Sequence, residues 1–188
     1  LLDLADPGHP IALGRHRSAI AIAISPDGQW VASGNWHGNE GVKVWQTSTR
    51  QMVKSIPMGT VTLSWSPDGR WLSVSGATGS NESQDQVLEA GSWTVRYASG
   101  IQESAGHSAF SPDSRTVAFI SEGGRNIRLH EVGRFRQLAT FEARSSSHAL
   151  WLSFSPDGNR LAAQEYRQGI QIWDLARLRE ELKTRGLD

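Results

Sequence analysis

A recurring tetrapeptide constrains the fold of this chain more than any other feature of its sequence. Ser-Pro-Asp-Gly stands at 25–28, 66–69 and 155–158, and Ser-Pro-Asp-Ser stands at 111–114. Each copy fits a type I turn, because Pro fixes φ at the second position and Gly relieves strain at the fourth. The copies start 41, 45 and 44 residues apart. A period near 40 residues indicates propeller blades or a solenoid.

A second marker keeps the same period. Short β-type segments end in a large residue followed by a polar one, at Leu2-Asp3, Trp45-Gln46, Leu88-Glu89, His130-Glu131 and Trp173-Asp174. These pairs are 43, 43, 42 and 43 residues apart. Because two independent markers hold nearly one period along the chain, we interpret the sequence as a repeat protein.

Within one period, four strand-like segments become more polar from first to last. In the first complete unit they cover 20–24, 30–32, 42–45 and 52–56. An apolar first strand belongs inside the molecule and a half-polar fourth strand at its rim, which is the arrangement of a four-stranded blade around an axis. The fold class predicted is all-β: a partial β-propeller with three complete four-stranded antiparallel blades, two incomplete blades and a short C-terminal helix.

The same pattern assigns every residue to one partial propeller. We expect the last two strands of a truncated blade at 1–14, complete blades at 15–57, 58–100 and 101–142, a blade lacking its fourth strand at 143–174, and a helix at 175–186. Asp174 can cap this helix, and Gly186 can end it. Leu175, Leu178 and Leu182 would form its apolar stripe, and Glu181 would pair with Arg185.

These turns, with "VKVWQ" and "IQIWDL", resemble WD40 repeats over essentially the whole chain. Trp173-Asp174 is the one true WD dipeptide, and His16 is similar to the histidine that precedes the first strand in that family. The resemblance implies a ring of about seven blades that binds partner proteins. The family's buried Asp-His-Ser-Trp network is expected to be incomplete here. Blade three also resembles TolB-type propeller repeats, which we keep as an alternative family.

The closing segment "WDLARLREELKTRGLD" resembles the C-terminal ends of bacterial WD40 arrays. Such arrays occur in multidomain signalling proteins, often downstream of a Ser/Thr kinase domain. The resemblance implies that this chain is the C-terminal portion of a larger ring, with the remaining blades supplied by the parent chain or by a second copy.

Composition and charge argue against several classes of function. The formal net charge is +0, which argues against a dedicated nucleic-acid surface or a polybasic membrane surface. The longest apolar run, at 19–24, is far too short to span a bilayer. The chain has no cysteine, so the compartment stays open, with the cytoplasm favoured. We predict no cofactor and no metal, because the histidines lack metal-site spacing and thiolates are absent.

The binding hypothesis rests on the loops opposite the Ser-Pro-Asp turns. These loops join second to third strands and lead into each first strand, and WD40 proteins commonly bind partners there. Trp, Tyr and Arg dominate interface energetics. The candidate partner-binding residues, all expected to be exposed, are Arg15, Arg17, Trp36, His37, Met58, Arg125, His148, Tyr166 and Arg167.

The leading hypothesis is therefore a non-enzymatic scaffold for an unknown protein or peptide partner. One alternative is a propeller-based hydrolase or lyase with a metal in the central funnel, although no G-x-S-x-G elbow or phosphate loop occurs. Another is a purely structural spacer. Nucleic-acid binding ranks last, because a basic stripe is missing.

Overall fold

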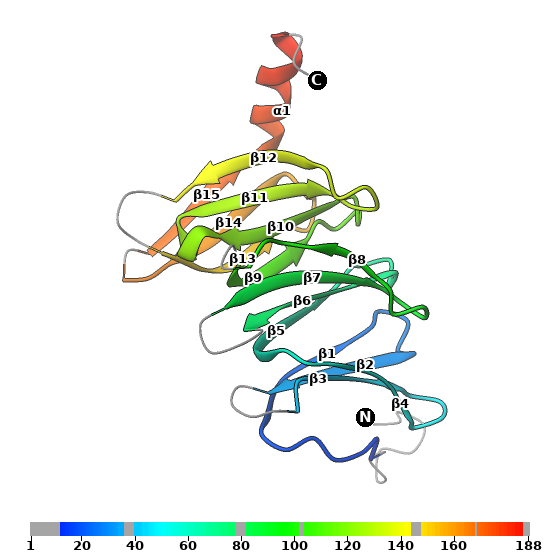
Figure 1. Cartoon of the computed structure of the whole chain (residues 1–188). Coiled ribbons are helices and arrows are strands. Elements are labelled where there is room, and N and C mark those ends of the chain that lie inside the picture. The colour runs from blue at the N-terminus through cyan, green and yellow to red at the C-terminus, as the bar shows by residue number, and fades with distance from the viewer. Residues whose placement is uncertain are drawn as a thin grey trace.

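Four antiparallel sheets stacked side by side, followed by one helix, make up the chain (Figure 1). The computed structural model describes residues 12–35, 40–77, 82–101, 104–143, 148–167 and 169–185. The elements are β1 (Ala19–Ile24), β2 (Trp30–Asn35), β3 (Val42–Gln46), β4 (Met52–Ile56), β5 (Gly59–Trp65), β6 (Trp71–Ala77), β7 (Ser83–Glu89), β8 (Val95–Ala98), β9 (Ser104–Phe110), β10 (Thr116–Ser121), a short 3-10 turn (Glu122–Gly124), β11 (Asn126–Glu131), β12 (Gln137–Glu142), β13 (Ala149–Phe154), β14 (Arg160–Glu165), β15 (Gly169–Asp174) and α1 (Leu175–Thr184).

Each sheet is a simple meander in chain order, which we number as blades 1 to 4. Blades 1 to 3 have four strands, and blade 4 has the three strands β13, β14 and β15. The predicted all-β fold with one short C-terminal helix is confirmed. Most of the expected N-terminal half-blade, 1–11, lies outside the described residues, and 12–14 form no strand.

The Ser-Pro-Asp turns are held by a hydrogen-bond pattern that repeats in every blade. In blade 2 the Ser66 hydroxyl donates to the Asp68 carboxylate at 2.5 Å and accepts from the Trp71 N–H at 3.0 Å. The same carboxylate accepts from the Arg70 N–H at 3.1 Å. Ser25, Ser111 and Ser155 form the equivalent bonds. The tetrapeptide recurs because serine and aspartate together satisfy the backbone groups that a tight turn leaves free.

The fourth turn position is left-handed, which explains its preference for glycine. Gly28, Gly69 and Gly158 have φ values of 70°, 73° and 69°. Ser114 occupies the same position in blade 3 with a φ of 60°, a conformation that costs a residue with a Cβ. Its hydroxyl offsets part of that cost by accepting a hydrogen bond at 3.0 Å from the Asp68 N–H of the neighbouring blade.

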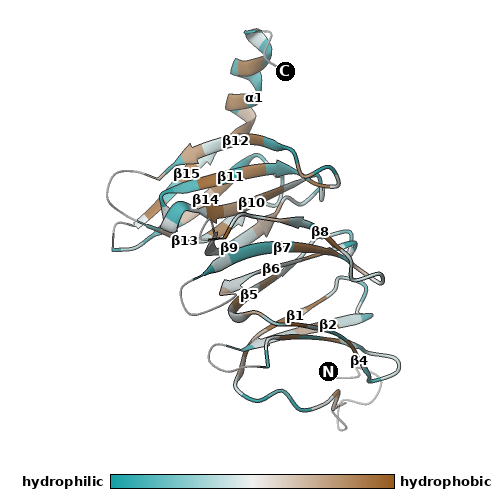
Figure 2. Cartoon of the chain, viewed as in Figure 1, coloured by the Kyte–Doolittle hydropathy of each residue, from teal (hydrophilic) through white to brown (hydrophobic). Residues whose placement is uncertain are grey.

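The cores lie between blades rather than within one. Val42 and Val44 of blade 1 pack with Leu72 and Leu88 of blade 2. Blades 2 and 3 enclose a mainly aromatic cluster, and blades 3 and 4 an aliphatic one. Figure 2 shows hydrophobic (brown) and hydrophilic (teal) residues alternating and mixed along the strands, with β7 largely hydrophilic. Each sheet is therefore stabilised mainly by burial against its neighbours.

His130 stands in blade 3 where tryptophan stands in blades 1 and 4. Its Nδ1–H donates to the Phe135 carbonyl at 3.1 Å, and its ring lies against Tyr97 and Phe119. Burial lowers the pKa of His130, because a charged imidazolium would lose its hydration there. The neutral ring serves as an aromatic core residue.

Helix α1 follows β15 directly and projects away from the stack (Figure 1). The Asp174 carboxylate accepts from the Arg177 N–H at 2.9 Å, so the predicted N-cap is confirmed. Leu175 is buried and Leu178 packs on the blade 3–4 core, but Leu182 is exposed. The expected Glu181–Arg185 pair is wrong, because Glu181 pairs with Arg177 at 2.9 Å. The expected stop, Gly186, lies outside the described residues.

Two further sequence patterns predict something other than the structure shows. The polar run "GATGSNESQDQ" at 76–86 predicts an extended loop, but β6 extends to Ala77 and residues 83–86 form the start of β7, because these strands pair as far as Ala77 and Ser83. The strand phase of Trp151 predicts a core position, but its side chain is 56% exposed. Within the described part of the chain, no helix is long and apolar enough to cross a membrane.

We predict that Ser66→Ala lowers the free energy of unfolding by about 1–3 kcal/mol, because it leaves the buried Trp71 N–H without an acceptor. Ser155→Ala removes the same bonds from a more accessible turn, where water can replace them, and should cost less. Urea unfolding of both variants measures the difference. An equal or larger loss in Ser155→Ala would contradict this account of the turn.

Candidate functional site

The meander order puts two kinds of connection at opposite ends of every blade. First-to-second and third-to-fourth strand turns lie at one end, which we call the turn face. Second-to-third strand loops and the segments entering each first strand lie at the other end, which we call the loop face. All the predicted partner-binding residues belong to loop-face segments, so their placement decides whether they form a surface.

In blade 1, the segment before β1 is anchored by a buried hydrogen-bond chain. The His16 Nδ1 lies 2.8 Å from the Ser33 hydroxyl, which also accepts from the Trp45 indole N–H at 3.0 Å. A Cβ on Gly14 would clash with the Trp45 ring, so the chain must approach that ring closely. The WD40-type network, which was expected to be incomplete, retains its His-Ser-Trp part in blade 1.

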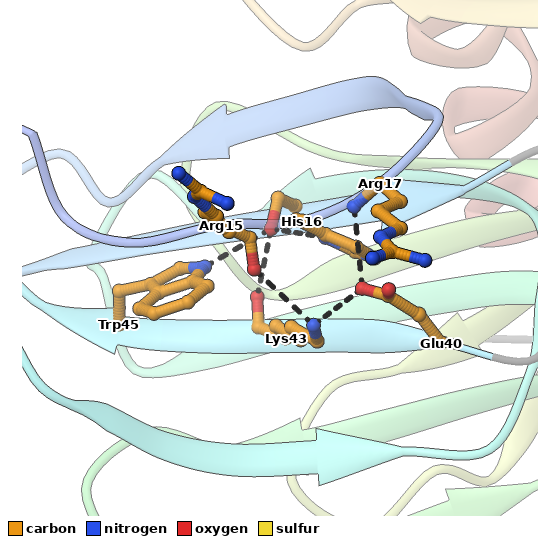
Figure 3. A network of polar contacts seen from close by, with 7 residues as sticks. Arg15, His16, Arg17, Glu40, Lys43 and Trp45 are labelled. Carbon is orange, nitrogen blue, oxygen red and sulfur yellow. Dashed lines mark hydrogen bonds and ion pairs between the residues drawn. The ribbon is translucent and has the colours of Figure 1, made fainter.

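Charged groups surround the hydrogen bonds that join His16, Ser33 and Trp45, as Figure 3 shows. Glu40 forms an ion pair with Lys43 and accepts from the Arg17 N–H at 3.2 Å, while Lys43 also donates to the Arg15 carbonyl at 3.3 Å. Burial and then the nearby Lys43 lower the pKa of His16, although Glu40 opposes the effect. The bond from Lys43 lowers the pKa of Glu40. The network fixes the backbone of Arg15 and Arg17 and leaves their side chains exposed.

A second group of predicted residues meets where blades 3 and 4 adjoin. The Tyr166 N–H donates to the His148 carbonyl at 2.9 Å. Gly124 packs so closely on His148 that a Cβ there would come within 2.8 Å of the histidine Cβ. Arg125 follows Gly124, and the Arg167 guanidinium lies 5.0 Å from the centre of the Tyr166 ring. Arg125, His148, Tyr166 and Arg167 are all exposed, and we call them the blade 3–4 patch.

Of the remaining predicted residues, one is buried and two lie outside the described part of the chain. Met58 was expected to be exposed, but it is 2% exposed and belongs to the core between blades 1 and 2. The short β4–β5 connection turns its side chain inward, because the Met58 N–H bonds to the Ile56 carbonyl at 2.9 Å. Trp36 and His37 lie outside the described residues.

The inner strands carry a feature that the sequence did not single out. Leu63, His107 and Leu152, from three blades, line a cavity of about 240 Å³. The Leu152 N–H donates to the His107 Nδ1 at 3.2 Å, and the Trp151 ring lies 4.2 Å from the imidazole. Burial lowers the pKa of His107 from 6.5 to about 4. In the sequence, His107 is a single histidine within a strand-like segment, which could have marked it as unusual. That pattern does not show that the imidazole contacts the next blade.

Two observations concern the metal and hydrolase alternatives. In the ranges that the structure describes, no group of three or more His, Asp or Glu side chains could hold a metal ion. His107 contacts a backbone amide and an indole rather than a nucleophile. What the arrangement offers is exposed arginine, histidine and tyrosine side chains on a rigid β framework.

The fold defines the class first: this chain is a repeat protein of the β-propeller type. Residues 10–46, which include β1, β2 and β3, match the family model described as "WD domain, G-beta repeat". A curated relative is "Telomerase protein component 1" of Rattus norvegicus, which is 27% identical over 185 residues. The match covers 92% of this chain and 6% of the rat protein.

Solved structures agree on the fold. The chain resembles a structure titled "Crystal structure of RRP9 WD40 repeats" with a TM-score of 0.68 and 17% identity, covering 88% of this chain and 51% of that chain. It resembles hydrazine synthase of Kuenenia stuttgartiensis with a TM-score of 0.66 and 21% identity, covering 85% of this chain and 47% of that chain. It also resembles the Cps50 (Swd1) β-propeller domain of Myceliophteria thermophila, with a TM-score of 0.64 and 20% identity. That match covers 83% of this chain and 53% of the other chain. The chain thus spans about half the length of these structures.

We predict that the free energy of unfolding falls as the pH decreases from 6.5 toward 4. Unfolded His107 binds a proton near pH 6.5 whereas the folded imidazole binds one near pH 4, so the stabilisation is complete above 6.5 and is lost below it. The loss from His107 amounts to about 3 kcal/mol. Urea unfolding across this range measures the slope, and His107→Gln should make it shallower. An unchanged slope in the variant would contradict the assignment.

Proposed function

We propose that this chain is a non-enzymatic scaffold that presents its loop face to a protein or peptide partner. The observation that carries the proposal is the blade 3–4 patch, where exposed Arg125, His148, Tyr166 and Arg167 come from three neighbouring loops. Arginine and tyrosine are the residue types that contribute most to interface energies. Sheets packed on one another hold such loops rigidly, which reduces the entropy lost on binding.

Blade 1 supplies the rest of the proposed surface. Arg15 and Arg17 are exposed on a segment whose backbone is tied to Glu40 and Lys43. Trp36 and His37 stay in the proposal on the sequence argument alone. Met58 is removed from the proposed surface, because its side chain is buried.

We expect peptides selected from a displayed random library on the folded chain to depend on the loop face. The double variant Tyr166→Ala/Arg167→Ala should weaken the selected peptides by at least about tenfold, because each removed side chain is an exposed contact. Arg115→Ala, an exposed arginine on a turn between β9 and β10, is the matched control and should bind as the parent does. Fluorescence anisotropy measures both. Selected peptides that respond only to Arg115→Ala would contradict the proposal.

We also propose that further blades, from the parent chain or a second copy, cover the open end of the stack. The support comes from equivalent positions. Val42 and Val44 on β3 are 0% exposed against blade 2, whereas Ile170 and Ile172 on the corresponding strand β15 are 72% and 61% exposed. Two adjacent exposed isoleucines on a sheet face without a neighbour are typical of an interface.

On this proposal, the chain by itself should associate through its open face. We expect light scattering to detect species larger than one chain at micromolar concentration. The double variant Ile170→Asp/Ile172→Asp should shift them toward the monomer, because desolvating carboxylates opposes association. Circular dichroism checks that the variant stays folded. A parent chain that is monomeric throughout the concentration range would overturn the proposal.

We propose, finally, that the ring belongs to a larger bacterial signalling protein. The resemblance of residues 173–188 to the ends of bacterial WD40 arrays supports this context. The small share of its curated relative that the chain spans supports only a larger parent protein.

A further inference from the structure

The blade 3–4 patch carries positive charge on two exposed arginines, Arg125 and Arg167. Among the described residues, neither the Arg125 nor the Arg167 guanidinium forms an ion pair. The nearby acid Glu122 is already engaged, because Arg128 binds one of its carboxylate oxygens at 2.8 Å and Asn126 binds the other at 2.6 Å. The patch therefore offers two arginines whose donors are free for a ligand.

Two more acids lie close by and must be counted. Glu165 directly precedes Tyr166, but it is buried, at 6% exposed, whereas both arginines are exposed. Glu142 ends β12 and its backbone pairs with Asn126, the residue after Arg125. Glu142 is exposed, and its carboxylate makes no ion pair with Arg125 or Arg167. Among the described, exposed charged side chains of this region that form no ion pair, two are arginines, Arg125 and Arg167, and one is the acid Glu142.

Arg167 is held in a strained conformation beside an aromatic platform. Its φ is 59°, the left-handed region that costs a residue with a Cβ, and glycine would adopt it freely. Its guanidinium lies 5.0 Å from the centre of the Tyr166 ring, within the range of a cation–π contact. Stacking on Tyr166 orients the guanidinium before a ligand arrives.

We propose that the blade 3–4 patch binds an acidic peptide segment of a partner protein. Carboxylates of the segment would pair with Arg125 and Arg167, since guanidinium groups match carboxylates in bidentate geometry. An apolar side chain between the carboxylates would pack on the exposed Tyr166 ring, with His148 at the edge of the contact. This inference rests on the proposed function, to which it adds the chemical class of the partner.

A nucleic acid is the less fitting ligand for this patch. Duplex and single strands present a long row of phosphates that proteins meet with a stripe of basic residues. Here two unpaired arginines stand beside Glu142 and the neutralised Glu122, and the formal net charge of the chain is +0. A short segment with a few carboxylates fits such a small charged area.

The direct test uses a fluorescent peptide in which glutamate alternates with leucine, and a matched peptide with glutamine in place of every glutamate. We expect the chain to bind the glutamate peptide at least about tenfold more tightly at low salt, with the difference reduced as salt screens the charges. An oligothymidylate of similar length is the third probe. Equal binding of the glutamine peptide, or tighter binding of the oligonucleotide, would overturn the proposal.

Two variants locate the binding on the patch. Arg125→Ala and Arg167→Gly should each weaken the glutamate peptide by about three- to tenfold. Arg167→Gly should also raise Tm by roughly 2–4 °C, because glycine relieves the left-handed backbone. Loss of binding by a variant that is more stable excludes misfolding as the cause.

The matched control is Arg50→Gly. Arg50 is also an exposed arginine with a positive φ, of 61°, but it lies in the turn between β3 and β4 on the turn face. We expect Arg50→Gly to raise Tm similarly and to bind the glutamate peptide as the parent does. Equal weakening by Arg50→Gly and Arg167→Gly would overturn the assignment to the patch. Library peptides that depend on Tyr166 but lack acidic residues would overturn this inference and leave the proposed function standing.

Discussion

Face-to-face packing between neighbouring sheets is the constraint on which the rest of this structure depends. A blade of four short strands has two faces and too little volume to bury either by itself, so its apolar side chains are covered only when another blade lies against it. The clusters around Val44, Val117 and Leu161 are all of this kind. The exposed isoleucines of β15 show what the same strand position looks like without a neighbour.

Hydrogen bonds between neighbouring blades fix how the packed sheets are placed relative to one another. Thr62 donates to the Gly106 carbonyl of the next blade at 2.6 Å, and Ser108 donates to the Ser73 hydroxyl at 2.8 Å. The Trp65 indole N–H donates to the Ala23 carbonyl at 3.3 Å. Because each bond needs one particular alignment of two sheets, such bonds favour one relative placement over a sliding stack. That fixed placement lets loops from different blades form one surface.

The blade 3–4 patch depends on this placement and could be predicted only in part. Residue type and position in the repeat indicated that Arg125, His148, Tyr166 and Arg167 lie on loops at one end. The sequence held no information on whether those loops adjoin, and contact between Gly124 and His148 settled that point. The same reasoning failed for Met58, because a connection of few residues turned its side chain into the core.

The sequence by itself determined the strands, the turn chemistry and the helix cap, because each depends on residues within a few positions of one another, and counting between the turns determined the period. Ser25, Asp27 and Gly28 specify their turn locally, and Asp174 caps its helix locally. Tertiary structure alone decided which faces are buried, how His107 meets Leu152, and which arginines are left without acids. The His107–Leu152 contact, for example, joins residues 45 positions apart, whose distance is set only when the blades pack.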